Sequence, residues 1–388
     1  MTAKWDIIKT YIEDNRSDML ALWEKLVNTE SGPRQEQGIN DVIKILQQEM
    51  EQAGICSRVL PVKGAGNILV GEWNTNADSK PFLLIGHMDT VFPAGCVQHR
   101  PFCIDKQGNA HGPGVLDMKG GLVAALYTVK ALSAIGWNKY PIKMVFAGDE
   151  ETMHMSSDAK QILKAEMEGA IAAFNFETGY PNDALVVGRT GGGIVHITIT
   201  GVSAHSGLEP QKGRSAILEA ARIVMELESK NDNSRGKLIN CGEIQGGIGE
   251  NTIPDACSLR IGYRFPSNTI EWEILEDLEA AVSHHFVDGT QIKCEQKMHI
   301  DCMETTPDVD RLYRHVEETA RMCGYGLVSE ANVCGGSDSA ISVSVGVPTI
   351  CGMGVRGQYN HTEQEYAEVE SLFERCYLSA CSISGLDW

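Results

Sequence analysis

Histidine and acidic residues follow short apolar runs at several points of this sequence, a pattern typical of metal sites. His87 ends the apolar run Leu83–Gly86, and Asp89 stands two residues further on. In an extended chain, positions i and i+2 face the same way, so we expect Asp89 to lie behind the His87 imidazole and orient it as a metal ligand. Taken alone, the pair also fits a buried structural histidine beside a turn aspartate.

A second acidic residue follows a loop rich in glycine and proline. Asp117 comes just after Gly112–Gly114 and opens a predicted helix over 118–135. Loops of this kind let the backbone approach a ligand closely, and the two carboxylate oxygens of Asp117 could bridge two cations. An ordinary helix N-cap is the alternative interpretation of Asp117.

Three consecutive acids, Asp149, Glu150 and Glu151, follow a predicted strand over 142–147. Because like charges repel, a buried cluster of this kind requires a metal ion or a proton. Neighbouring residues of an extended chain point to opposite sides, so we expect Glu150 and Glu151 to differ in role, one on a metal and one on water. The alternative is a solvated acidic loop.

Two further candidates are Glu177, which ends another apolar run, and His361, near the end of the chain. Together with the residues above they supply five or six nitrogen and oxygen ligands, a set that suits paired Zn²⁺, Mn²⁺ or Co²⁺. In open α/β sheets, sites lie outside the carboxyl ends of the strands, where these residues fall. The combination therefore predicts a metal centre.

The sequence resembles the M20 family of metallopeptidases, which includes glutamate carboxypeptidases, aminoacylases, acetylornithine deacetylase and succinyl-diaminopimelate desuccinylase. The resemblance covers nearly the whole chain. Its motifs stand in the family order: HMDT at 87–90, GPGVLDMKGG at 112–121, GDEET at 148–152, FET at 176–178 and YNHT at 359–362.

The resemblance implies a ligand set for two zinc ions, with Mn²⁺ or Co²⁺ as alternatives. The implied ligands are His87 and Glu177 on one ion, Glu151 and His361 on the other, and Asp117 between them. Glu150 then matches the general base, which takes a proton from the water molecule that attacks the amide carbon, and Asp89 orients His87. The family also has a cis peptide bond after the aspartate that corresponds to Asp117.

The resemblance also implies residues that bind substrate. His205 matches a histidine that reaches the partner subunit's active site, and Arg264 matches an arginine that binds the substrate carboxylate. Further matches are Asn251, in the segment NTIP, and Gly335, Gly336 and Ser337 in a glycine-rich loop. The chain departs from the family pattern at Gly262, where many members carry aspartate, and at His154, where small residues are usual.

The function implied is hydrolysis of an amide or peptide bond next to a free carboxylate, with a small peptide or an N-acyl amino acid as substrate. One alternative is a dipeptidase or aminopeptidase that binds a free amine. Glu177 favours the carboxypeptidase and aminoacylase branch, because tripeptidase-like and dipeptidase-like members tend to have aspartate there. A second alternative, an inactive metal-dependent binding protein, predicts the loss of a ligand or of the base, and none is missing.

Apolar periodicity predicts the elements that position these residues. In the first part of the chain we expect helices over 5–28, 38–54 and 118–135, and strands over 67–73, 81–86, 142–147 and 170–176. From 193 to 299 the order strand, helix, strand, strand, helix, strand is the split βαββαβ unit. A helix over 309–322 and a final one near 366–382 resume the first pattern.

The predicted fold class is therefore α/β, with an aminopeptidase-like catalytic sheet sandwich and an inserted α+β ferredoxin-like domain. We predict a catalytic metal-binding domain from residues 1–188 and 304–388. Residues 189–303 form the predicted lid and dimerisation domain, through which the resemblance implies a homodimer.

Composition excludes several classes of partner. A net charge of -19 disfavours nucleic acid and anionic membranes, which bind clustered Lys and Arg. The 12 cysteines are scattered, which predicts reduced thiols and a cytoplasmic protein. The first six residues lack the apolar run of a signal peptide, and no apolar stretch approaches the roughly 20 residues that cross a bilayer.

Overall fold

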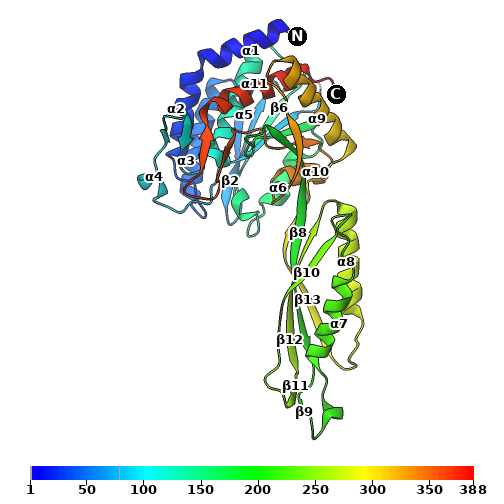
Figure 1. Ribbon diagram of the computed structural model, residues 1–388. Coiled ribbons are helices and arrows are strands. Elements are labelled where there is room, and N and C mark those ends of the chain that lie inside the picture. The colour runs from blue at the N-terminus through cyan, green and yellow to red at the C-terminus, as the bar shows by residue number, and fades with distance from the viewer. Residues whose placement is uncertain (1, 78) are drawn as a thin grey trace. The chain divides into compact units, whose positions relative to one another are not determined.

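The computed structural model describes residues 2–77 and 79–388, which divide into two compact units (Figure 1). Unit 1 runs up to Val187 and also holds Thr305–Asn332 and Ser337–Trp388. Unit 2 holds Gly188–Glu304 and Val333–Gly336. The segment Val333–Gly336 was predicted to lie in the catalytic domain, but β14 pairs with β8 and this pairing draws the segment into unit 2.

The main sheet of unit 1 has six strands in the order β1-β2-β6-β3-β7-β15. Strands β6, β3, β7 and β15 run parallel, whereas β1 and β2 are antiparallel to their neighbours. The bounds are β1 Cys56–Leu60, β2 Gly66–Trp73, β3 Phe82–His87, β6 Ile142–Gly148, β7 Ala172–Asn175 and β15 Thr349–Ile350.

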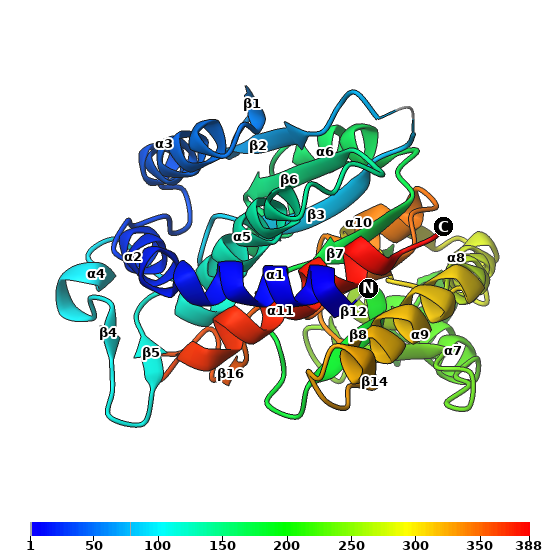
Figure 2. The same cartoon turned by 90° about the horizontal axis from the view of Figure 1, so that it is seen from above.

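Helices cover both faces of this sheet, because its strands bury alternate side chains on opposite sides. In β3, for example, Phe82 and Leu84 pack into one apolar cluster and Leu83 and Ile85 into another. The first cluster is covered by α1, α2, α3, α5, α9 and α11, and the second by α6 and α10. Figure 2 shows these layers from above, with α1 and α11 packed against each other.

The helices of unit 1 agree with the predicted periods in most places. Their bounds are α1 Thr2–Asp14, α2 Arg16–Val27, α3 Glu36–Gln52, α4 Cys96–His99, α5 Gly120–Ala134, α6 Ala159–Met167, α9 Pro307–Met322, α10 Ser339–Ser344 and α11 Val369–Gly385. The single helix expected over 5–28 is wrong, since Asn15 leaves helical geometry and its side chain donates to the main-chain oxygen of Tyr11.

A buried helix, α5, leads away from the candidate metal site. Its apolar and small residues are buried almost all round, as in a helix at the centre of a domain. A Cβ at Gly121 would come within 2.0 Å of the main-chain oxygen of Phe176, so this glycine allows the helix to start directly beside the end of β7.

Short elements complete unit 1. A small sheet has the order β16-β17-β5-β4, and two short helical segments, an irregular π-type one (η1) and a 3₁₀ turn (η2), lie in the chemical motifs. The bounds are β4 Cys103–Ile104, β5 Asn109–His111, β16 Gly357–Gln358, β17 Tyr366–Glu368, η1 Val115–Lys119 and η2 Glu150–Thr152.

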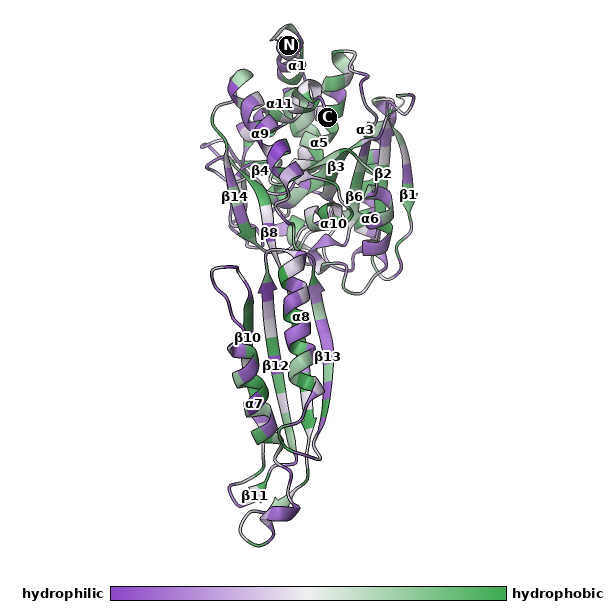
Figure 3. Cartoon of the chain, turned by 90° about the vertical axis from the view of Figure 1, so that its right-hand side faces the viewer, coloured by the Kyte–Doolittle hydropathy of each residue, from purple (hydrophilic) through white to green (hydrophobic). Residues whose placement is uncertain are grey.

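Unit 2 is the predicted βαββαβ unit. Its sheet has the antiparallel order β10-β12-β8-β13, with β14 also paired to β8. Helices α7 and α8 lie side by side on one face (Figure 3). The bounds are β8 Ala184–Thr200, α7 Ala216–Glu228, β10 Leu238–Gly246, β12 Ala256–Phe265, α8 Asn268–Ser283, β13 Gln291–Ile300 and β14 Ser329–Cys334, with minor elements β9 Ala204–His205, η3 Pro210–Lys212 and β11 Thr252–Ile253.

Side-chain alternation explains the one-sided packing of this sheet. On β12, Leu259, Ile261 and Tyr263 are buried, whereas Arg260 and Arg264 are exposed on the opposite face. The strand thus presents an apolar side to the helices and a polar side away from them. Over the described residues, no helix is both long and apolar enough to cross a membrane.

Candidate metal centre

Three neighbouring parallel strands end at the same edge of the main sheet, and each delivers a candidate ligand. Strand β3 lies between β6 and β7. His87 is the last residue of β3, Glu150 follows the end of β6, and Glu177 follows the end of β7. All three side chains are buried. The carboxyl edge of the sheet therefore positions them together, as expected from the sequence.

The first ligand group consists of His87, Asp117 and Glu177. The Nε2 atom of His87 lies 3.1 Å from Oδ1 of Asp117 and 3.7 Å from Oε1 of Glu177. Its Nδ1 atom lies 3.1 Å from the main-chain oxygen of Asp89, which can only accept a hydrogen bond. A proton therefore belongs on Nδ1, and Nε2 would offer its lone pair to a cation bound in this group.

The second ligand group consists of Asp117, Glu151 and His361. The Nε2 atom of His361 lies 3.1 Å from Oδ2 of Asp117 and 3.2 Å from Oε2 of Glu151. Asp117 thus belongs to both groups and presents a different oxygen to each histidine. The peptide bond between Asp117 and Met118 is cis, as the resemblance implied.

Glu150 lies beside the ligands. Its Oε2 atom is 3.9 Å from Nε2 of His87, and its side chain is buried. The extended chain expected here is wrong, because residues Glu150–Thr152 form a 3₁₀ turn. In that turn Glu151 faces His361 while Glu150 faces His87, so the two glutamates still occupy different surroundings.

Asp89 has a wider role than the sequence indicated. Its carboxylate is 3.4 Å from Nδ1 of His87, but it also accepts the main-chain N–H of Glu150 (3.1 Å) and of Glu151 (3.0 Å). One buried side chain therefore holds both the first histidine and the backbone of the glutamate pair.

Glu365, a buried residue that the sequence analysis did not single out, fixes the loop that carries Asp117. Its carboxylate accepts the main-chain N–H groups of Gly114, Leu116 and Asp117 at 2.9 to 3.0 Å. Burial raises the pKa of Glu365 to about 7, and these three donors oppose the shift. Its position four residues after His361 was the available signal.

Electrostatics favour a cation at this centre. Hydrogen bonds that His361 donates to Asp117 and Glu151 raise its pKa to about 10. Burial alone would lower the pKa of His87, but Asp117, Asp89 and the nearby glutamates raise it well above its usual value. The carboxylates therefore create a negative field at both imidazoles, and a divalent cation would be attracted by the same field in place of the protons.

The two acids at the centre respond in opposite directions. Burial raises the pKa of Glu150 well above its usual value, and the charges of Glu177 and Asp338 add to this effect against that of His87. Burial alone would raise the pKa of Asp117 as well, but hydrogen bonds donated by His361 and His87 outweigh burial and lower it. Asp117 is therefore the charged carboxylate between the histidines, while Glu150 readily accepts a proton.

The donor set fits divalent metal ions. Each group offers one imidazole nitrogen and two carboxylates, with candidate ligand atoms within 4.8 Å of one another. The Oε1 atom of Glu151 is buried and has no hydrogen-bond partner among the described residues. A buried carboxylate oxygen is costly without a partner, and a bound cation would supply one.

The predicted glycine-rich loop divides between the units. Ser337, in unit 1, accepts a hydrogen bond from Asn175 Nδ2 (2.9 Å) and donates one to Oε1 of Glu177 (3.3 Å). Gly335 and Gly336 belong to unit 2. Only Ser337 of this loop is therefore placed in the metal centre by these contacts.

The remaining predicted substrate residues lie in unit 2. His205 is exposed, and its Nδ1 accepts the N–H groups of Gly207 (3.1 Å) and Leu208 (3.2 Å). Asn251 is exposed, and its main-chain oxygen accepts the N–H of Ser206. Arg264 is exposed on β12.

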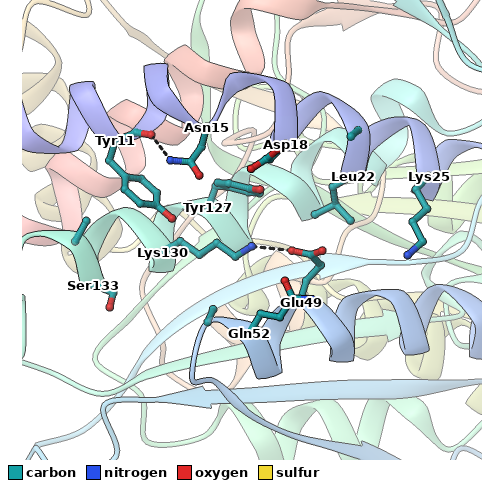
Figure 4. A pocket seen from close by; sticks show the side chains of 13 residues that line it. Tyr11, Asn15, Asp18, Leu22, Lys25, Glu49, Gln52, Tyr127, Lys130 and Ser133 are labelled. Carbon is teal, nitrogen blue, oxygen red and sulfur yellow. Dashed lines mark hydrogen bonds and ion pairs between the residues drawn. The ribbon is translucent and has the colours of Figure 1, made fainter.

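A cavity of about 660 Å³ lies elsewhere in unit 1, lined by residues of α1, α2, α3 and α5 (Figure 4). Lys130 donates to Glu49 across it (2.7 Å) and lies over the ring of Tyr127. None of the predicted site residues lines this cavity. We therefore take the ligand cluster at the sheet edge, and not this cavity, as the candidate reactive site.

The fold and the ligand cluster together define a class, the metal-dependent peptidases and amidohydrolases built on an α/β sheet. The model of Peptidase family M20/M25/M40 matches residues 83–383. The chain therefore belongs to this family of hydrolases and is an enzyme.

Individual relatives agree with this assignment. The chain is 27% identical over 380 residues to carboxypeptidase G2 of Pseudomonas sp. (strain RS-16), covering 96% of this chain and 90% of the relative. It is 23% identical to succinyl-diaminopimelate desuccinylase of Marinobacter nauticus, and the match covers 81% of this chain and 88% of the relative. Among solved structures, aminopeptidase PepT of Bacillus cereus ATCC 10987 matches with a TM-score of 0.76 at 21% identity, covering 95% and 98%.

Proposed function

We propose that this protein is a two-metal hydrolase, with zinc as the metal, that cleaves an amide or peptide bond next to a free carboxylate. The observation that carries the proposal is the pair of three-residue ligand groups that share Asp117. Imidazole nitrogen and carboxylate oxygen also suit Mn²⁺ and Co²⁺, which are alternatives to zinc. Metal analysis of the purified protein tests the stoichiometry.

The residues around the cluster have separate tasks in this proposal. When bound, divalent cations would polarise the scissile carbonyl and lower the pKa of the attacking water. Glu150 takes the proton of the attacking water and passes it to the leaving amine. Asp89 holds Glu150 in place through its main-chain N–H, and Glu365 holds the loop of Asp117.

Arg264 is the proposed site for the substrate carboxylate. It lies opposite Gly192 of β8. A Cβ at Gly192 would come within 2.4 Å of Nη1 of Arg264, so the absence of a side chain there leaves space for the guanidinium group. Nη1 donates to the main-chain oxygen of Tyr263 (3.0 Å), which is its only hydrogen bond to the described residues. The other edge of the planar group is left for a two-point contact with a carboxylate.

Replacing Arg264 with lysine is expected to raise KM for acid substrates by at least about tenfold, because lysine cannot reproduce the planar fork. Arg260→Lys is the matched control, since Arg260 is an exposed arginine on the same face of β12. The measurement is kcat and KM on an N-acyl amino acid and on its C-terminal amide. Equal turnover of acid and amide by the wild type would contradict the carboxylate site.

The second candidate function is an aminopeptidase or dipeptidase that binds a free amine. It is favoured by the structural match to a protein named as an aminopeptidase. Two observations favour the carboxylate-reading hydrolase instead. Glu177 matches that branch of the family by resemblance, and two relatives are named as a carboxypeptidase and a desuccinylase. Blocking the substrate's amino group separates the two, because only the second function requires that amine.

His205 is proposed to contact the substrate that is bound in the partner subunit's active site. Because its Nδ1 accepts two main-chain N–H groups, its proton belongs on Nε2. In this tautomer Nε2 donates a hydrogen bond, which suits contact with the carbonyl oxygen as negative charge develops there.

Unit 2 supplies a surface for the proposed homodimer. Strand β10 is an edge strand, since within the described chain it pairs only with β12. Apolar side chains are exposed on β10 and on the neighbouring α7, among them Ile244, Leu218 and Met225 (75% exposed). An edge strand beside exposed apolar residues is suited to pairing with a second copy about a two-fold axis.

A subunit-mixing experiment tests both proposals. Glu150→Ala and His205→Ala homodimers should each have little activity, because each lacks one residue at every site. If the two chains are unfolded and refolded together in equal amounts, half the dimers are mixed and each has one intact site. Activity should then return to about a quarter of wild type.

Chains refolded separately and then combined serve as the control for exchange. If His205 serves its own chain, no mixed dimer has an intact site and no activity returns. Full activity of His205→Ala alone would remove the residue from the mechanism.

A cytoplasmic location is also proposed, because the 12 cysteines are scattered along the chain and all of them are free thiols.

A further inference from the structure

A buried histidine, His154, lies between two carboxylates next to the proposed active site. Its Nδ1 is 2.7 Å from Oδ1 of Asp149, and its Nε2 is 2.7 Å from Oδ1 of Asp338. All three side chains are buried. A neutral imidazole carries a single N–H, whereas two flanking carboxylate oxygens require two donors. The geometry therefore favours an imidazolium, which can donate to both acids.

The backbone is strained to place this ring. Met153 and His154 have φ values of 55° and 54°, in the left-handed region that non-glycine residues rarely adopt. Such residues persist where surrounding contacts hold them, and they concentrate at functional sites. Ser157 Oγ donates to Oδ2 of Asp149 (2.5 Å), so the acid on this side is held from both directions.

The two acids belong to segments that carry the proposed chemistry. Asp149 directly precedes Glu150, and Asp338 directly follows Ser337, whose hydroxyl donates to Glu177. In the glutamate pair, Asp89 contacts the main-chain N–H groups of Glu150 and Glu151 and not their side chains. The ring of His154 therefore joins the turn of the glutamate pair to the loop beside the ligand Glu177, two segments that are 184 residues apart at the contact.

We propose that His154 is a positioning residue, a doubly protonated imidazole that connects Asp149 to Asp338 and thereby holds Glu150 in line for proton transfer. The inference rests on the proposed function, because it takes Glu150 as the base. The charges of Asp338 and Asp149 outweigh the effect of burial and raise the pKa of His154 to about 11, which agrees with the geometry.

The first test measures the protonation of His154 in the wild-type, metal-loaded protein by ¹⁵N NMR with histidine-selective labelling at pH 8. An ordinary histidine, with a pKa of about 6.5, is neutral at that pH. We expect both ring nitrogens of His154 to carry protons, with the signals assigned by their absence from His154→Gln. A single protonated nitrogen would overturn the proposal, whether or not the protein hydrolyses any substrate.

The second test compares His154→Gln with His99→Gln, a matched control at an exposed histidine on α4. Per metal-loaded chain, His154→Gln should lower kcat by about tenfold to a hundredfold with KM within about twofold, since a misplacement of about 1 Å can cost on the order of 10²-fold. A purely structural role would reduce the yield of folded protein and leave kcat per loaded chain unchanged, and that result would overturn the proposal. Inactive wild-type protein would instead contradict the proposed function.

Discussion

Removing metal with a chelator is expected to abolish hydrolysis, and adding about two equivalents of Zn²⁺ should restore it. The physical reason is the cluster itself, in which Asp117, Glu151 and Glu177 converge on two imidazoles, one buried (His87) and one exposed (His361). Without cations these carboxylates repel one another and have no Lewis acid to direct at substrate. The measurement is activity against metal content per chain.

Two readouts protect this prediction from ambiguity. The melting temperature should fall on chelation and rise with added metal, because a ligand that binds only the folded state stabilises it. His87→Ala should lose metal, whereas His111→Ala should keep it, since His111 lies on β5 and pairs with Asp105 outside the cluster. Full activity of metal-free protein would contradict the proposed mechanism.

The candidate ligands could be picked out from the sequence because they follow visible patterns, and the structure brings them together in two groups. The run that becomes β3 is buried on both faces, so it stands out as apolar, and His87 marks its end. The βαββαβ order of unit 2 was also visible, since β12 alternates buried and exposed residues along its whole length. In both cases a local period reports the packing of the element.

The sequence could not predict features that depend on distant contacts. Strand β1 has no buried residue and is recognisable only by its pairing with β2. Glu365 contacts the loop of Asp117 across 248 residues, and His154 meets Asp338 across 184. Apart from the position of Glu365 four residues after His361, nothing local distinguishes these residues from ordinary polar ones, because the fold brings their partners close.

The glutamate pair occupies two different surroundings, but not for the reason expected. Different roles were predicted from an extended chain, whereas a turn at Glu150–Thr152 separates the two side chains. The turn is held by Asp89, whose carboxylate accepts both main-chain N–H groups. The assignment of the base therefore depends on side-chain surroundings rather than on alternation, and it needs a direct experiment.

Replacing Glu150 with glutamine is expected to lower kcat by about 10²- to 10⁴-fold, the usual contribution of general base catalysis. Glutamine has nearly the same size and keeps the main-chain hydrogen bond to Asp89, but its amide cannot accept the proton. Metal content and melting temperature should therefore stay near those of the wild type. Glu168→Gln, on the surface after α6, is the control for the substitution itself.

Glu151→Gln gives the matched comparison one residue further along the chain. Its carboxylate faces His361 in the second ligand group, so this variant should lose metal as well as activity. Loss of metal from Glu150→Gln, with metal retained in Glu151→Gln, would show that the roles of the two glutamates are exchanged. A kcat near that of the wild type in metal-loaded Glu150→Gln would place the base elsewhere, because no substitution of a proton acceptor by an amide leaves proton transfer intact.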